Sequence, residues 1–204
     1  MLATETRGGG PMNKQSTMRS LWPQFSAGKR IPASAEPFEN GMVAPQRGDY
    51  PTALKYVRAL AKQGNPQAQY HLGCMYAEGE DEAEAVKWFR KAAEQGDADA
   101  QNELGVMYTA GRGVPRNHAE AAKWYRMAAE QGNVGAQTNL GLIHYIGEGV
   151  PQDLVKAHMW FNIVAALGDE SAQKDRDAAA GLMARDQIAE AQRMAREWMA
   201  KHQQ

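Results

Sequence analysis

One sequence unit recurs along this chain, and the spacing of its copies limits the folds that the chain can adopt. The clearest copy runs from Ala100 to Gly132. Four copies each close on a glycine, at Gly64, Gly96, Gly132 and Gly168, with intervals of 32, 36 and 36 residues. Recurrence at a period of 20 to 50 residues predicts a solenoid, in which each unit packs against its neighbours in the sequence.

Each unit contains two segments with the periodicity of an α-helix. The first segments share an alanine, a leucine followed by glycine, and a tyrosine or histidine: Ala68–Leu72–Gly73–Tyr76, Ala100–Leu104–Gly105–Tyr108 and Ala136–Leu140–Gly141–His144. The second segments share an aromatic residue among small residues, at Trp88, Trp124 and Trp160. Because residues four apart lie on one helix face, we expect the leucines in the core and the glycines where helices approach closely. We expect the tryptophans to interlock the two helices.

Helix ends are marked as regularly as helix cores. The terminating glycines stand where a left-handed residue closes a helix. An Asp or Asn precedes each expected helix, where its side chain can accept from free N–H groups. These predicted N-caps are Asp49, Asn65, Asp81, Asp97, Asn117, Asn133, Asp153 and Asp169. One residue pair therefore ends one helix and begins the next, and the loop at 79–81 is shorter than those at 111–117 and 147–153.

These patterns predict an all-α chain of stacked helix-turn-helix repeats. The hydrophobic share of 43% is largely alanine, which suits closely packed helices. The expected array spans residues 37–200, with units at about 37–64, 65–96, 97–132 and 133–168. Arg176 and Asp177 then replace the Leu-Gly pair, so residues 169–200 are predicted to form a C-terminal cap, with a last helix near 186–202.

Residues 1–36 differ from the rest in composition. Gly8-Gly9-Gly10-Pro11 and the lack of an apolar period predict a disordered tail, and its charge of +3 allows contact with an acidic partner. Ala33-Ser34-Ala35 resembles a signal-peptidase site, but the apolar runs upstream are very short, and Leu21-Trp22 is followed by Pro23. A secretory signal needs a longer apolar region. The sequence as written therefore predicts a cytoplasmic protein, with export to the periplasm as the alternative, and no transmembrane segment.

Motifs that resemble chemical sites have structural interpretations. Gly111-x-Gly113 and Gly147-x-Gly149 lack the strand-helix context of a phosphate loop and are predicted to be turns. The five histidines, His71, His118, His144, His158 and His202, show no metal-ligand spacing. Cys74 is expected to be a packed thiol, and no serine nucleophile motif occurs. We therefore predict no catalytic residue, no metal and no cofactor. The net charge of −1 and mixed charges also argue against nucleic acid.

Several positions recur jointly and identify a family resemblance. The patterns A-x-x-x-L-G-x-x-Y, G-x-G-V-x-x-[D/N], K-W-[F/Y] and A-A-E-x-G resemble the Sel-one-like repeat family, which is related to tetratricopeptide repeats. The resemblance implies a right-handed α-solenoid and a bacterial adaptor that holds other proteins. Cysteine-rich relatives are associated with β-lactamase activity, so a β-lactamase-like hydrolase or a cell-envelope regulatory protein is the alternative function.

By analogy with tetratricopeptide arrays, the first helices line a concave groove. Groove positions then flank the core leucine at fixed offsets and select nine residues: Gln67, Tyr70, Cys74, Asn102, Val106, Thr109, Thr138, Leu142 and Tyr145. These side chains are polar, aromatic or moderately apolar, which suits an extended peptide or a helix. The alternative is that they are ordinary surface residues. We expect a monomeric, non-enzymatic adaptor that binds a protein or peptide in this groove.

Overall fold

The computed structural model describes residues 50–202 of the chain. The chain divides into two compact units, 1–53 and 54–204, of which the second contains the complete repeats. The predicted tail at 1–36, the start of the first repeat at 37 and the cap at Asp49 lie outside the described residues. Within the described residues the chain forms α-helices and no strand, which confirms the predicted all-α solenoid of stacked helix-turn-helix units.

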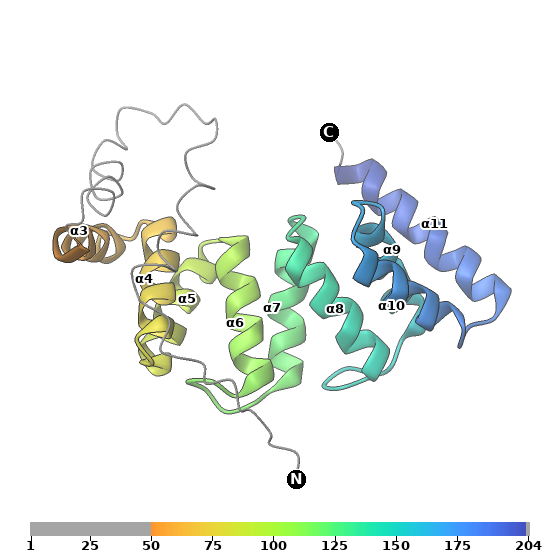
Figure 1. Ribbon diagram of the computed structural model, residues 1–204, viewed down its shortest axis with the longest axis horizontal. Coiled ribbons are helices and arrows are strands. Elements are labelled where there is room, and N and C mark those ends of the chain that lie inside the picture. The colour runs from red at the N-terminus through yellow and green to blue at the C-terminus, as the bar shows by residue number, and fades with distance from the viewer. Residues whose placement is uncertain (1–49, 203–204) are drawn as a thin grey trace, which may run out of the picture. The chain divides into compact units, whose positions relative to one another are not determined.

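The helices alternate between first and second helices of successive repeats (Figure 1). Their bounds are α3 Tyr50–Lys62, α4 Pro66–Glu78, α5 Glu82–Glu94, α6 Ala98–Ala110, α7 His118–Glu130, α8 Val134–Ile146, α9 Leu154–Ala165, α10 Glu170–Ala180 and α11 Arg185–His202. From α4 to α10 each helix packs against the next one in the chain. The first helices of the repeats are α4, α6 and α8, and the second helices are α5, α7 and α9.

The predicted helix ends are confirmed wherever the structure describes them. Seven Asx side chains each accept a hydrogen bond from the backbone N–H three residues on: Asn65, Asp81, Asp97, Asn117, Asn133, Asp153 and Asp169. Gly64, Gly96, Gly132 and Gly168 have φ values of 98°, 93°, 88° and 93°, as expected of a left-handed closing residue. Local chemistry therefore sets where each helix begins and ends.

The aromatic residue that interlocks the two helices is not the predicted tryptophan but the residue after it. Phe89, Tyr125 and Phe161 are buried, and each ring lies directly on the glycine of the preceding first helix. A Cβ atom built at Gly73, Gly105 or Gly141 would lie 2.6 Å from that ring. One step along a helix turns a side chain by about 100°, so the tryptophans point elsewhere. Trp88 and Trp124 are only partly buried.

A buried amide ladder joins consecutive units, and the sequence analysis missed it. Gln69, Gln101 and Gln137 are at most 5% exposed, and their Nε2 atoms donate to the carbonyls of Ala61, Ala93 and Ala129 at 3.0–3.2 Å. The Oε1 atoms of the first two accept from the end of the second helix of their own unit, since Gln95 donates to Gln69 at 2.6 Å and Gln131 to Gln101 at 2.7 Å. Each ladder step ties three helices together.

The ladder stops at its third step. Gln137 Oε1 is buried and has no hydrogen-bond partner among the described residues. The residue that would donate to it, by the spacing of Gln95 and Gln131, is Leu167, which is 67% exposed. A buried acceptor without a donor costs about 1–3 kcal/mol.

Each of the two longer interhelical loops packs on the second helix of the preceding unit. Gly113 and Gly149 have φ values of 67° and 75°. A Cβ atom at Gly113 would lie 2.2 Å from the carbonyl oxygen of Glu82, and one at Gly149 would lie 2.4 Å from the carbonyl carbon of His118. A side chain at either position would collide with the neighbouring backbone, so both positions require glycine. The prediction that the two Gly-x-Gly segments are turns is confirmed.

The same two loops carry ionic contacts of opposite polarity. Arg112 Nε lies 2.6 Å from Glu82 Oε1. At the equivalent places 36 residues later, Glu148 replaces the arginine and His118 replaces the glutamate, with 3.3 Å between His118 Nε2 and Glu148 Oε2. The basic partner is thus on the loop at one contact and on the helix at the other.

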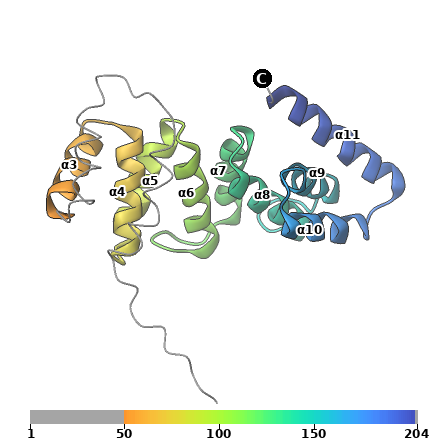
Figure 2. The same ribbon diagram turned by 45° about the horizontal axis from the view of Figure 1, so that its top comes forward.

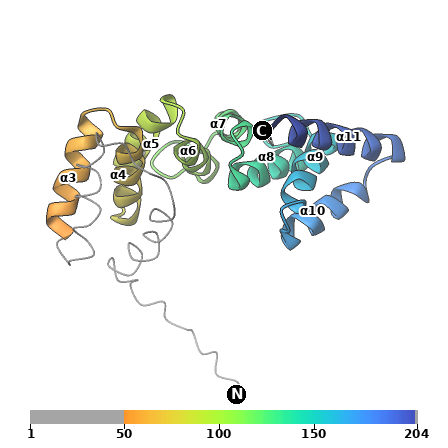
Figure 3. The same cartoon turned by 90° about the horizontal axis from the view of Figure 1, so that it is seen from above.

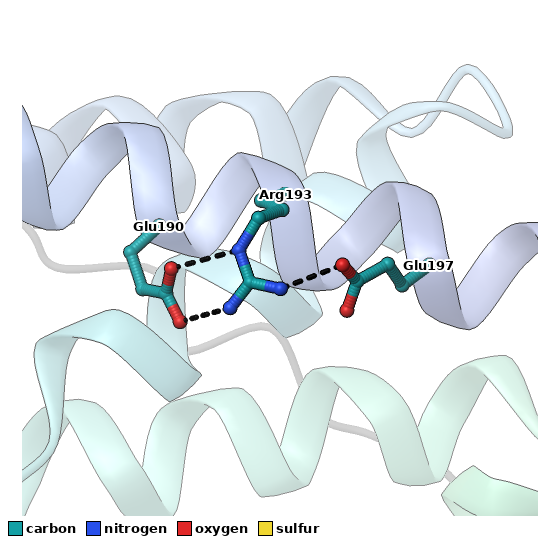
Figure 4. Close-up of polar contacts among 3 residues, drawn as sticks. All are labelled: Glu190, Arg193 and Glu197. Atoms are coloured by element: carbon teal, nitrogen blue, oxygen red, sulfur yellow. Dashed lines mark hydrogen bonds and ion pairs between the residues drawn. The ribbon is translucent and has the colours of Figure 1, made fainter.

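The last helix covers the second helix of the final complete repeat. Helix α11 packs against α9 (Figures 2 and 3). The Trp198 ring meets the Trp160 ring edge-on with centroids 5.7 Å apart, and Ala191 and Ala195 are fully buried. The opposite side of α11 is polar, with Arg193 bridging Glu190 and Glu197 at 2.6 Å (Figure 4).

Candidate interaction surface

The nine predicted groove residues lie on α4, α6 and α8, and we call the outward side of these three helices the first-helix face. Gln67 is exposed and Leu142 is 37% exposed. The others are partly buried: Tyr70, Cys74, Asn102, Val106, Thr109, Thr138 and Tyr145. Most of these side chains are therefore only partly accessible to a partner.

Asn102 links two first helices across this face. Its Oδ1 accepts from Asn139 Nδ2 of α8 at 3.2 Å, and its Nδ2 donates to Glu103 Oε1 at 3.4 Å. Tyr70 occupies the position of Asn102 one unit earlier, and Glu103 that of Asn139. The bond between Asn102 and Asn139 thus joins α6 to α8 across the face.

Tyr70 and Cys74 form the α4 part of the face. Both side chains pack against the core between α5 and α6. Burial raises the pKa of the Tyr70 hydroxyl, and burial also raises the pKa of Cys74 to about 12. Cys74 is therefore a neutral packed thiol at physiological pH, as the sequence predicts.

Two of the predicted residues use their polar groups internally. Thr109 Oγ1 donates to the Gly105 carbonyl at 3.0 Å and lies 3.2 Å from the Tyr125 hydroxyl. Thr138 Oγ1 donates to the Val134 carbonyl at 3.2 Å. The hydroxyl groups of these threonines are thus engaged within the chain.

Two exposed apolar residues lie close together on α8. Leu142 and Ile146, one helical turn apart, are 37% and 57% exposed, with Tyr145 between them in the sequence. The sequence analysis missed Ile146, because the chosen offsets from the core leucine end one residue before it. The sequence does indicate Ile146, because Leu142, Ile143 and Ile146 are apolar residues separated only by His144 and Tyr145.

Charge is segregated between first and second helices, which the sequence analysis also missed. Helices α4, α6 and α8 contain Glu78, Asp99 and Glu103 and no Lys or Arg. The basic residues of the repeat helices lie on the second helices: Lys87, Arg90, Lys91, Lys123, Arg126 and Lys156. A count of charge along the chain averages these two faces and conceals the difference.

The described residues present no assembled chemical site. No group of His, Cys, Asp and Glu side chains within residues 50–202 could hold a metal ion. Ser171 is the single serine in that range, and it is exposed on α10. No helix of this part of the chain is both long and apolar enough to cross a membrane.

Comparisons with known proteins agree with this architecture. The Sel1 repeat model matches residues 38–65, 66–97, 98–133 and 134–169. The crystal structure of c5321, a protective antigen of uropathogenic Escherichia coli with a Sel1-like repeat fold, aligns with a TM-score of 0.72 and 29% identity. That alignment covers 92% of this chain and 45% of c5321, so the chain spans about half the length of that antigen.

A Sel1 repeat protein from Oxalobacter formigenes is 38% identical, with a TM-score of 0.56 over 61% of this chain and 97% of that one. The comparison with curated proteins finds no significant match. The repeat matches cover well over half of the chain. The chain therefore belongs to the Sel1 repeat family, whose members are helical repeat proteins that generally serve as protein-interaction scaffolds.

Proposed function

We propose that this protein is a non-enzymatic adaptor whose solenoid, residues 37–200, binds a protein segment along the first-helix face. The observation that carries the proposal is the exposure of Leu142 and Ile146 one turn apart on α8. Single exposed apolar residues are common on protein surfaces, but neighbouring ones on one helix face mark an interaction site. Stacked repeats provide the extended surface that such a segment needs.

The second helices are less suited to binding. Three of their four lysines are paired within the same helix or with its cap, since Lys87 pairs with Glu84, Lys123 with Glu120 and Lys156 with Asp153. These pairs reduce the basic character that nucleic acid binding requires. We propose that the protein acts on protein partners, as a monomer and without nucleic acid.

Site-specific photo-crosslinking tests the proposed face. We would place benzoylphenylalanine at Leu142 or Ile146 on the first-helix face, and at Met127 on α7 as the control. Met127 is 46% exposed and apolar, so it matches Leu142 in chemistry and accessibility. In lysate from the cells that make this protein, we expect discrete crosslinked proteins from positions 142 and 146 and none from 127. Identical products at all three positions, or none at 142 and 146, would reject the face.

A further inference from the structure

We infer that the partner is an amphipathic α-helix, and that its apolar, uncharged side docks on the C-terminal ends of α8 and α10. The inference rests on the proposed function and deepens it, because it names the kind of partner and extends the binding surface from α8 to α10. We call the five residues that form this site the C-terminal apolar surface: Leu142, Tyr145, Ile146, Leu182 and Met183.

Large exposed apolar side chains lie at the ends of these two helices. Leu142, Ile146 and Leu182 are 37%, 57% and 63% exposed. Leu182 follows Ile146 by 36 residues, which is the period of the last two units, so the two residues occupy equivalent positions. One and two units earlier this position holds Ala110 and Glu78. The repeat itself therefore does not require a large apolar residue here.

Leu182 keeps the helical register of α10, although it lies two residues beyond the end of that helix. The backbone N–H of Leu182 donates to the carbonyl of Ala179 at 3.0 Å. Gly181 has right-handed helical dihedral angles, with φ −62° and ψ −17°. Leu182 therefore stands at the end of α10 as Ile146 stands at the end of α8.

Tyr145 and Met183 connect the two helix ends. Both side chains are partly buried, and both pack against one small cluster of core residues: Ala157, Phe161 and Ala179. Ile146 and Leu182 are next to this pair in the sequence, so the exposed residues of both helix ends belong to one surface. With axes of neighbouring helices about 10 Å apart, this surface has the width of one further helix.

The C-terminal apolar surface carries no charge. Helix α8 contains no Asp, Glu, Lys or Arg, and neither do residues 178–184. A charged side chain of the partner would lose its hydration here, and none of the five side chains could serve as its counter-ion. An apolar side chain would instead bury area on Leu142, Ile146 and Leu182. The contacting side of the partner is therefore apolar and uncharged.

The same surface determines the backbone conformation of the partner. Tyr145 carries the one hydroxyl group among its five side chains, and none of them carries an amide. An extended segment would place its N–H and C=O groups against leucine and isoleucine side chains, which cannot pair with them. A helix pairs these groups internally, and its side chains at i, i+4 and i+7 form the apolar stripe that the surface needs.

Phage selection with two libraries tests the conformation of the partner. One library displays a stable helix with one randomised side, and the other displays linear random peptides of the same length. With the full-length chain as the target, we expect binders from the helical library, with Leu, Ile, Met or Phe at i, i+4 and i+7 and no charge among them. In fluorescence anisotropy, a proline at the centre of a selected peptide should weaken binding about tenfold.

Matched substitutions then locate the peptide on the chain. We expect Leu182→Ser and Leu142→Ser each to weaken a selected peptide by about tenfold. Ala178→Glu adds a charge at an exposed position one turn before Leu182 and should weaken it by a similar factor. Leu167→Ser is the control and should leave affinity unchanged, because Leu167 is 67% exposed but lies before α10, at its other end. Unchanged thermal midpoints establish that the variants remain folded.

Photo-crosslinking identifies the occupant of the surface. With benzoylphenylalanine at Leu182, we expect the purified chain to crosslink to a selected peptide and the crosslink to be lost when unlabelled peptide competes. A crosslink from this position to a second copy of the chain, or to residues 1–49 of the same chain, would assign the surface to a different occupant and overturn the inference.

The outcomes separate the two proposals. Binders from the linear library alone, peptides that tolerate the central proline, or peptides that depend on Leu142 but not on Leu182, overturn the helical partner and leave the first-helix face intact as a binding surface. Selected peptides that bind Leu142→Ser and Leu182→Ser as well as the unaltered chain overturn that face, and the helical partner with it.

Discussion

At the scale of single residues, the solenoid depends on polar side chains that the sequence pattern marks as surface. Gln69 and Gln101 are buried amides that join a helix of one unit to helices of the next. Their bonds are repeated because the residue before each closing glycine, Gln95 or Gln131, donates to them. Such a ladder fixes the angle between units, since a buried amide tolerates few alternative partners.

The broken step of this ladder gives a test at this scale. We expect Leu167→Gln to increase the free energy of unfolding by about 1 kcal/mol, because its Nε2 can donate to the buried Gln137 Oε1. Urea denaturation followed by circular dichroism measures the change. Leu167→Ala is the control, since it removes the exposed leucine without adding a donor. Equal stability of the two variants would show that the ladder cannot be extended here.

At the scale of helices, the sequence predicts the ends more reliably than the contacts. Asx caps and closing glycines act on the backbone within three residues, so Asp97 and Gly96 define their helix boundary locally. The choice between Trp88 and Phe89 as the interlocking ring depends on a turn of about 100° about the helix axis. Both residues are bulky and apolar, and only the position of the neighbouring helix distinguishes them.

The terminal helix offers a second test. We expect Trp198→Ala to lower the free energy of unfolding by about 2–3 kcal/mol, less than a fully buried tryptophan, because its ring packs edge-on against Trp160 while remaining partly accessible. Thermal and urea unfolding measure the loss. Arg193→Gln is the matched control on the exposed side of α11, where the ion pairs of Figure 4 are screened by water. A loss in the control as large as that of Trp198→Ala would contradict the assigned packing.

At the scale of the whole molecule, the proposed function depends on which face the repeats leave uncovered. The offsets from each core leucine place the candidate residues on α4, α6 and α8, because the repeat itself fixes the register. Exposure is a different property: Leu142 protrudes while Tyr145 is partly covered by α9 and by the residues around Ala179. This property is not contained in the pattern of one repeat.

Acid sensitivity is a third expectation and belongs to the folded chain as a whole. Burial lowers the pKa of His71 to about 4, and burial also lowers the pKa values of His144 and His158. A histidine whose pKa is lower in the folded state binds more protons when unfolded, so stability is complete above pH 6.5 and falls as the pH decreases toward the folded pKa. Burial raises the pKa values of Glu78 and Glu103, so these carboxyl groups bind more protons in the folded state than in the unfolded state. Their contribution to stability therefore increases as the pH falls, opposite to that of the histidines.

A substitution at His144 tests the histidine contribution to the pH dependence of stability apart from the carboxyl contribution. His144 occupies the position of Tyr76 and Tyr108, and it faces Lys156, Arg126 and Asp153. We expect His144→Tyr to reduce the loss of stability between pH 7.5 and 5.0, measured as the urea midpoint at each pH. His202→Gln, at an exposed position, serves as the control. The same pH dependence in His144→Tyr and in the unaltered chain would exclude His144 as a contributor.

The reversed loop contacts have a consequence for the number of units. Deleting residues 97–132 would set Glu148 against Glu82, so that acid meets acid. Duplicating the same residues would set the second Arg112 against the first His118, so that base meets base. Only the present order pairs Arg112 with Glu82 and Glu148 with His118. A change in the number of units would therefore replace a favourable loop contact by an unfavourable one.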